Sequence, residues 1–363
     1  MTEWDDLRQG IGDIDRKILD LYEERMKAVR MMARYKRETG MEPPEARRER
    51  CEWSAAADSG AGRLLQLLAD LGAEERQRTV SARDSQGAAR ALKVAFQGIK
   101  GCYSEEAAMD YFRDQLEPVS LEGFENVFQA LGQGQADRGV LPLENTSTGS
   151  IDQVYDLLAG YRCHIVGEYV LPVRHCLLGA EGASLEGLEE VFSHTQGFLQ
   201  CEIWLSAPER RHWRRTPHYD TATSAALVAK LGDPAKAAIA GRQAARAYGL
   251  RILAEDIQTY SNNHTRFIVI SRDPEVTSRC DKISLMFSVR NESGSLYRIL
   301  AEFARYGLNL VKIESRPIPE KNWEYRFYVD LDGNLNEPGI QEALKAVEGQ
   351  CLEYRLLGNY VKG

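Results

Sequence analysis

The stretch from Asn262 to Ser271 reads Asn-Asn-His-Thr-Arg-Phe-Ile-Val-Ile-Ser, a polar segment followed by a run rich in β-branched residues. The run from Ile268 to Ser271 predicts a short strand. The polar segment carries a hydroxyl on Thr265 and a guanidinium on Arg266, and a guanidinium is suited to bidentate pairing with a carboxylate. The stretch therefore predicts the start of a strand, with candidate residues of a functional site immediately before it.

The sequence around this stretch predicts an α/β domain. From Lys93 to Arg272, short β-branched runs alternate with alanine-rich segments. Polar stretches recur where strands are expected to end and helices to begin, and each one alone is as well explained as a helix cap or a tight turn. They are Gly98–Ser104, Gly139–Gly149, Ser193–Gln196, Thr221–Ala226 and Asn262–Phe267.

Taken in order, these stretches resemble the motifs of prephenate dehydratase, whose catalytic domain is similar to a two-lobed periplasmic-type binding protein. They read G-x-x-G-x-Y-S, L-P-x-E-N-T-x-x-G, S-H-x-Q, T-x-T-S-A-A and N-N-x-T-R-F. The resemblance covers residues 92–273, expected to form the dehydratase domain. Ile99 and Thr195 stand where that family usually has proline.

The resemblance implies that prephenate loses carbon dioxide and water to give phenylpyruvate. It makes Thr265 the donor or proton relay for the departing hydroxyl. An isolated threonine is a weak acid that a neighbour must tune, and Glu144 is a candidate acid if enclosure favours its protonated form. The guanidinium of Arg266 can pair bidentately with the side-chain carboxylate. The remaining substrate contacts that it implies are Asn145, Thr146, Ser193, Gln196, Thr223, Ser224, Asn263 and Phe267.

The first forty residues predict one long helix. Apolar residues recur in steps of four and three at Leu7, Ile11, Ile14, Ile18, Leu21, Ala28 and Met32. A helix of this length needs partner helices to bury the stripe, and these are expected from another subunit. Arg25 occupies a stripe position, and a buried cation requires an anion or an ion pair.

Residues 1–85 resemble the all-helical chorismate mutase family, whose three helices per subunit intertwine in a dimer. The resemblance implies that Arg8 and Arg25 bind carboxylates and that Lys36 acts in catalysis on the ether oxygen of chorismate. Arg48 and Glu49 would complete the site. The third helix departs from the family pattern after Leu71, so a domain that serves only as a scaffold stays open as an alternative.

Residues 281–363 predict a β-α-β-β-α-β order. The segment resembles the ACT regulatory domain, which has an α+β ferredoxin-like fold. This resemblance implies that phenylalanine inhibits the enzyme by binding to this domain. The turns that carry the match contain Gly294, Ser295, Leu296, Glu314, Ser315, Arg316 and Pro317. As a whole, the chain resembles bifunctional chorismate mutase/prephenate dehydratases, and a homodimer or homotetramer is expected.

Composition narrows the alternatives. The formal charge of −8 argues against a nucleic-acid partner, and no apolar run is long enough to predict a membrane span. The seven scattered cysteines suggest neither a disulfide framework nor a zinc site, so we expect no metal, no cofactor and a cytoplasmic enzyme. A dehydratase without mutase activity and a non-catalytic metabolite sensor are the competing interpretations.

Overall fold

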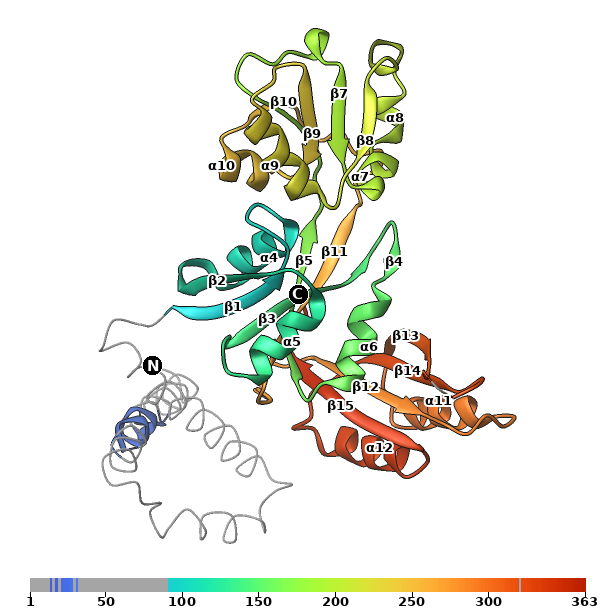
Figure 1. The fold of residues 1–363 in the computed structure, drawn as a ribbon. Coiled ribbons are helices and arrows are strands. Elements are labelled where there is room, and N and C mark those ends of the chain that lie inside the picture. Colours follow the sequence, from blue (N-terminus) through green and yellow to red (C-terminus); the bar gives the residue numbers. More distant parts are fainter. Residues whose placement is uncertain (1–13, 15–16, 19–20, 29–30, 32–90, 320) are drawn as a thin grey trace, which may run out of the picture. The chain divides into compact units, whose positions relative to one another are not determined.

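The computed structural model describes residues 14, 17–18, 21–28, 31, 91–319 and 321–363 (Figure 1). The chain divides into two compact units, Met1–Arg90 and Ala91–Gly363. The described residues of the first unit are helical, as the sequence predicts. Most of the predicted mutase site lies outside the described residues, namely Arg8, Lys36, Arg48 and Glu49.

The described part of the first helix exposes its predicted apolar stripe. Ile14, Ile18 and Leu21 are 57%, 47% and 64% exposed within a single chain, whereas Arg25 is half-buried. Apolar side chains in such a row gain free energy when a partner covers them. The requirement for partner helices therefore stays a prediction that this stripe supports.

The second unit begins with an α/β lobe, called lobe 1. Its sheet has the strand order β2-β1-β3-β11-β5, with the short β4 paired to β3. Strands β1, β2 and β3 are parallel, while β11 runs antiparallel to both β3 and β5. The elements are β1 (Leu92–Gln97), α4 (Tyr103–Phe112), a 3₁₀ turn (Arg113–Gln115), β2 (Leu116–Leu121), α5 (Phe124–Gly132), β3 (Arg138–Asn145), β4 (Gly149–Ser150), α6 (Asp152–Gly160), β5 (His164–Pro172) and β11 (His264–Ser271).

A second α/β lobe, lobe 2, is inserted between β5 and β11. Its sheet has the order β10-β6-β9-β7-β8. The chain therefore crosses between the lobes twice, which is the predicted two-lobed arrangement (Figure 1). The elements are β6 (Cys176–Gly179), β7 (Glu190–Ser193), α7 (Thr195–Gln200), α8 (Glu202–Leu205), β8 (Arg214–Pro217), α9 (Thr221–Leu231), β9 (Lys236–Ala240), α10 (Arg242–Tyr248) and β10 (Arg251–Ala254), with 3₁₀ turns at Leu185–Gly187 and Pro208–Arg210.

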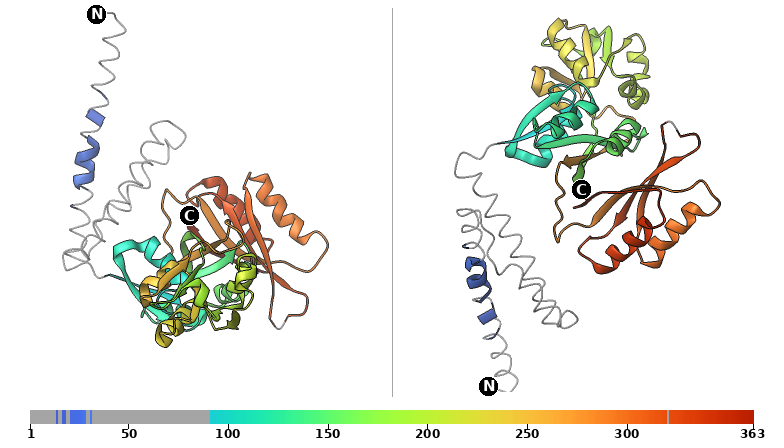
Figure 2. Two further views of the ribbon diagram at one scale, coloured as in Figure 1. Left: turned by 90° about the horizontal axis from the view of Figure 1, so that it is seen from above. Right: turned by 60° about the horizontal axis from the view of Figure 1, so that its bottom comes forward.

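The last part of the chain forms the predicted β-α-β-β-α-β domain, here called the sensor domain. Its antiparallel sheet has the order β13-β14-β12-β15, and α11 and α12 cover one face (Figure 2). On the other face, Met286 and Tyr328 enter the core of lobe 1. The elements are β12 (Lys282–Ser288), α11 (Ser295–Arg305), β13 (Leu310–Pro317), β14 (Tyr325–Asp332), α12 (Pro338–Glu348) and β15 (Glu353–Tyr360).

One boundary prediction was wrong. Thr265, Arg266 and Phe267 do not lie at a strand end that precedes a helix, but inside the antiparallel strand β11. Successive side chains of a strand point to opposite faces of its sheet. Thr265 and Arg266 are therefore directed away from each other, which changes what each can contact.

Candidate active site

The centre of the candidate site is the pairing of Thr265 with Asn145. Thr265 on β11 lies opposite Asn145, the last residue of β3, in the strand register. The Asn145 side-chain amide donates a hydrogen bond of 2.9 Å to the hydroxyl oxygen of Thr265. Because the threonine oxygen accepts this bond, its own proton is not used by Asn145.

The orientation of the Asn145 amide follows from its neighbours. Its Oδ1 accepts backbone N–H bonds from Ser147 at 2.8 Å and Thr148 at 3.2 Å. Its Nδ2 then faces three acceptors: the Thr265 hydroxyl, Asn263 Oδ1 at 2.8 Å and the His264 carbonyl at 3.1 Å. Reversing the amide would set a carbonyl oxygen against acceptors, so only one orientation satisfies the network.

Asn263 supplies a second polar group beside Thr265. Its side-chain oxygen accepts from Asn145 and from the Ser147 hydroxyl at 3.3 Å. Its Nδ2 is buried and has no hydrogen-bond partner, although the residue is only 3% exposed. A buried donor without a partner costs free energy. A bound oxygen-bearing molecule beside Thr265 would remove that cost.

The turn after β3 is fastened to the segment that precedes β11. The Thr146 hydroxyl donates to the Asn262 carbonyl at 2.8 Å and accepts from the His264 backbone N–H at 2.9 Å. Thr146 was predicted as a substrate contact, but its hydroxyl is occupied by this brace. Ser147, which the sequence analysis did not single out, takes part in the cluster instead.

Arg266 does not have the predicted geometry. Its guanidinium lies on the opposite side of β11 from Thr265, where Nη1 is 2.6 Å from Asp330 and 3.4 Å from Glu168, and Nε is 3.0 Å from Glu144. The side chain is only 10% exposed. With three carboxylates around it, Arg266 is a structural ion-pair centre between lobe 1 and the sensor domain rather than the expected carboxylate anchor.

Two further predicted residues have other roles. Glu144 lies opposite Arg266 and also pairs with Lys312 of β13. An ion pair uses a carboxylate in its ionised form, so this arrangement does not present Glu144 as a proton donor. Phe267 is 1% exposed and packs in the apolar cluster of lobe 1, so it supports β11 from within the core.

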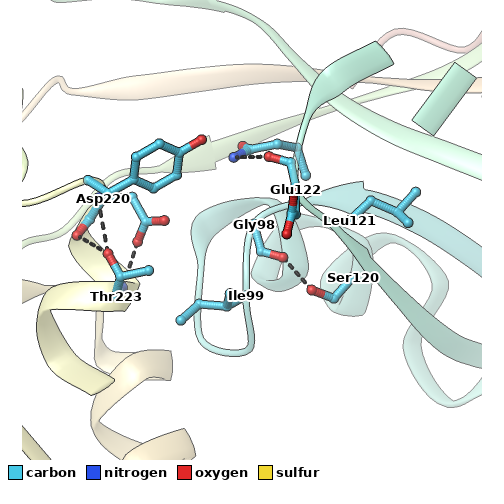
Figure 3. A pocket seen from close by; sticks show the side chains of 9 residues that line it. Gly98, Ile99, Ser120, Leu121, Glu122, Asp220 and Thr223 are labelled. Atoms are coloured by element: carbon cyan, nitrogen blue, oxygen red, sulfur yellow. Dashed lines mark hydrogen bonds between the residues drawn. The ribbon is translucent and has the colours of Figure 1, made fainter. Parts of the chain in front are cut away.

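A cavity of about 410 Å³ opens where the two lobes face each other (Figure 3). Lobe 1 lines it with the ends of β1 and β2, and lobe 2 lines it with the start of α9. Thr223 is the predicted residue found here, and its hydroxyl and backbone N–H form a reciprocal capping box with Asp220. Thr265 is not among the lining residues, so in this structure the cavity and the Thr265 cluster are separate features.

The other predicted contacts in lobe 2 are mostly structural. The Ser193 hydroxyl donates to the Ile239 carbonyl and the Ser224 hydroxyl to the Asp220 carbonyl, and both residues are fully buried. Neither presents its proton to a ligand in this arrangement. Gln196 lies exposed in the first turn of α7, where its backbone N–H is capped by His194. The side chain of Gln196 is therefore accessible to solvent.

Glycine controls how closely the lobes approach. A Cβ added at Gly101 would lie 2.8 Å from the Cα of Ala244 in lobe 2, and Gly101 has φ +85°. The neighbouring Tyr248 of lobe 2 donates from its hydroxyl to the Lys100 carbonyl at 2.7 Å. The glycine loop Gly98–Gly101, which the sequence left open as a helix cap or a tight turn, thus serves lobe-to-lobe packing.

A buried histidine that the sequence did not reveal joins the two lobes. His175, in the crossing after β5, lies 2.9 Å through Nδ1 from the Tyr103 hydroxyl and 2.6 Å through Nε2 from Gln200 Oε1. Burial lowers the pKa of His175, which favours the neutral ring. The Gln200 oxygen only accepts, so Nε2 carries the proton. No spacing in the sequence marks such a contact between distant segments.

The turns predicted to bind phenylalanine lie at the start of α11 and on β13. Gly294 has φ +80° and precedes α11, and Ser295 is buried at the first turn. Leu296 packs against the sensor core. On β13, Ser315 and Pro317 are exposed, whereas Glu314 and Arg316 face lobe 1. Alternate residues of Glu314–Pro317 therefore face solvent and lobe 1.

Within the described part of the chain, no group of three or more His, Cys, Asp or Glu side chains could hold a metal ion. Among the same residues, no helix is long and apolar enough to span a membrane. The side chains hydrogen-bonded around Thr265 carry hydroxyls and amides.

The fold and this cluster define a two-lobed α/β domain with a hydroxyl and amide site, followed by an ACT-type regulatory domain. Profiles of known families match the same segments: prephenate dehydratase over residues 94–275, the ACT domain over 283–349, and chorismate mutase type II over 7–69. The chain belongs to the prephenate dehydratase family.

Relatives extend this match to the full length. The bifunctional chorismate mutase/prephenate dehydratase of Aquifex aeolicus (strain VF5) is 32% identical, over 100% of this chain and 99% of the relative. The arogenate dehydratase/prephenate dehydratase 2 of Arabidopsis thaliana is 40% identical over 74% of this chain and 72% of its own. A solved prephenate dehydratase from Arthrobacter aurescens, in complex with L-Phe, is 28% identical with a TM-score of 0.69, over 74% of this chain and 90% of that one.

Proposed function

We propose that this chain converts prephenate to phenylpyruvate at the Thr265 cluster. The observation that carries the proposal is the direction of one hydrogen bond: Asn145 donates to the Thr265 oxygen, which leaves the threonine proton available to a ligand. Prephenate must lose a carboxylate as carbon dioxide and a ring hydroxyl as water. The electron pair of the broken carbon–carboxylate bond enters the ring, which becomes aromatic as the hydroxyl departs.

Thr265 stabilises the charge that develops on the departing oxygen. A preorganised donor aimed at such an oxygen lowers the barrier, because the charge grows only as the bond breaks. The bond from Asn145 polarises the threonine hydroxyl and strengthens its donation. The unpartnered Nδ2 of Asn263, whose Oδ1 also accepts from Asn145, is a second available donor in the cluster. We expect the substrate to reach both groups when the lobes close on it.

The same chain carries out the preceding step, the rearrangement of chorismate to prephenate. The match of residues 7–69 to chorismate mutase type II and the full-length relatives support this activity. Arg25 is half-buried on the first helix, as a carboxylate-binding cation would be. The roles of Arg8, Lys36, Arg48 and Glu49 remain proposals from the resemblance. A scaffold without activity is not favoured by relatives that align from end to end.

Phenylalanine inhibits the dehydratase through the sensor domain. The ACT match and the L-Phe complex of the Arthrobacter aurescens relative support this. We assign the ligand to the turns at Gly294–Leu296 and Glu314–Pro317, where Ser315 and Pro317 are the exposed residues while Glu314 and Arg316 face lobe 1. We further propose a homodimer or homotetramer as the assembly and the cytoplasm as the compartment.

One assay tests these assignments. Purified full-length protein is given chorismate or prephenate, and phenylpyruvate is followed with and without phenylalanine. Product from both substrates, reduced by phenylalanine, is the expected result. Absence of product from prephenate would refute the dehydratase. Product from prephenate but not from chorismate would reduce the first domain to a scaffold.

A further inference from the structure

One strand of the sensor domain presents three charged residues to lobe 1. On β13, Lys312, Glu314 and Arg316 alternate with the more exposed Ile313 and Ser315. Residues two apart in a strand share a face. The strand register sets the three charged residues opposite Asp330, Tyr328 and Arg326, on the face of the sensor sheet that meets lobe 1. We call these three residues the β13 clamp.

All three clamp residues hold the β3–β4–α6 segment. Lys312 pairs with Glu144, the penultimate residue of β3. Glu314 accepts a hydrogen bond from the hydroxyl of Ser150 in β4. The helix α6 follows directly and runs beside β13 (Figure 1).

The third clamp residue, Arg316, makes the most extensive contact. Its guanidinium lies 2.5 Å from Asp152 and 2.9 Å from Asp156, both in α6, and its Nε donates to Asp156 at 3.3 Å. The arginine side chain is 19% exposed, while the two carboxylates are 60% and 44% exposed. The aspartates therefore lie at the surface of lobe 1, where a substitution does not disturb a core.

The held segment carries the residue that orients Thr265. Glu144 and Asn145 are neighbours in β3, and β4 pairs with both of them through Ser150 and Gly149. Asn145 in turn donates to Thr265. A single peptide bond therefore separates Glu144, which Lys312 holds, from Asn145, whose amide polarises the threonine hydroxyl.

The clamp is polar, and this makes it adjustable. Beside Lys312 lies a cavity of about 540 Å³, lined by Arg266, Lys282, Val170 and others, so β13 is not packed tightly against lobe 1 here. Ion pairs at a surface are individually weak. Because the three contacts project from one strand, a small shift of β13 changes all of them together, and such shifts are how switching domains transmit a signal.

We propose that Lys312, Glu314 and Arg316 are positioning residues for the dehydratase, holding Asn145 against Thr265 in the active state and releasing it when the sensor domain binds its ligand. This inference rests on the proposed function and adds the route by which the sensor reaches the site. In this proposal Asn145 is aligned with Thr265 in the active state and not in the state that binds the ligand. Allostery requires such a pair of states, for which the ligand has different affinities.

The test breaks the clamp from the lobe 1 side, so that the sensor domain keeps its own sequence. The variant is Asp152→Asn with Asp156→Asn in the full-length protein. The matched control is Glu353→Gln, which breaks the 2.9 Å pair with Arg326 inside the sensor domain and leaves the clamp intact. Measurements are kcat and KM for prephenate, phenylalanine binding by calorimetry, the inhibition at saturating phenylalanine, and hydrogen exchange of the segment 143–157.

We expect the double variant to lose at least fivefold in kcat with KM within twofold, because alignment rather than binding is affected. Phenylalanine should bind at least as tightly as it does to the wild type, because the variant already favours the released state, while the ratio of uninhibited to inhibited rate shrinks by a similar factor. Exchange in 143–157 should be faster, and the control should match the wild type. Unchanged exchange and an unchanged inhibition ratio in the double variant would overturn the clamp.

The exchange measurement does not require turnover, so it separates this inference from the proposed function. If the wild-type protein does not consume prephenate but segment 143–157 exchanges faster in the double variant than in the wild type, the dehydratase is refuted and the link between the sensor domain and lobe 1 is supported. Loss of inhibition together with loss of phenylalanine binding would refute the link, because the aspartates would then act on the ligand site. Lys312→Gln provides an independent variant with the same expected signature.

Discussion

Replacing Thr265 by valine removes one hydroxyl and keeps the shape of the side chain. In the folded protein that hydroxyl accepts a bond from Asn145, whose Nδ2 still has Asn263 Oδ1 and the His264 carbonyl as acceptors. No buried donor is left without a partner, so the free energy of unfolding should fall by only about 1 kcal/mol, the worth of an ordinary hydrogen bond. Valine also suits the interior of a strand.

The effect on the rate should be far larger than the effect on stability. A group that donates to a departing oxygen contributes roughly 10²- to 10⁴-fold, which corresponds to about 3–5.5 kcal/mol in the barrier. We therefore expect Thr265→Val to lose at least 100-fold in kcat for prephenate with little change in melting temperature. Thr265→Ser, which keeps the hydroxyl, should stay within about tenfold of the wild type.

The measurement is the initial rate of phenylpyruvate formation, together with a thermal melt of each variant. The mutase rate with chorismate provides an internal control, since residue 265 lies outside that domain. A Thr265→Val protein that kept more than a tenth of the wild-type kcat would refute the role of the threonine. Equal losses in the serine and valine variants would show that packing, rather than the proton, matters.

Three other predictions concern stability. Arg266→Met should lower the free energy of unfolding by about 3 kcal/mol, because Asp330 would remain buried without its cation, whereas Glu168 keeps Lys282; a stable variant with a raised KM for prephenate would instead restore the predicted substrate role. Gly294→Ala should cost about 1 kcal/mol in urea unfolding, since φ is +80° there, and no loss would contradict that strain. Burial raises the pKa of Cys201 to about 12, so in the folded state its thiol stays protonated while the unfolded thiol ionises from about pH 9. Stability should therefore fall as pH rises from 9 towards 12, less steeply in Cys201→Ser, and equal slopes would argue against this cause.

The sequence by itself was enough to predict the architecture. Period-2 and period-3.6 patterns and turn residues mark elements locally, which is why β11 contains the predicted run Ile268–Ser271 and the last domain has the predicted β-α-β-β-α-β order. The ordered motifs were also sufficient to identify the family. These are properties of short segments, and they do not depend on what lies across a sheet.

Only the tertiary structure decided what the side chains contact. The motif places Thr265 next to Arg266, yet their position within β11 directs them to opposite faces, one towards Asn145 and the other towards Glu144, Glu168 and Asp330. These partners lie 64 to 122 positions away along the chain, and the contact distances come from strand register and domain packing. Sequence determined which residues are available, and the pairing of distant strands determined which of them form the site.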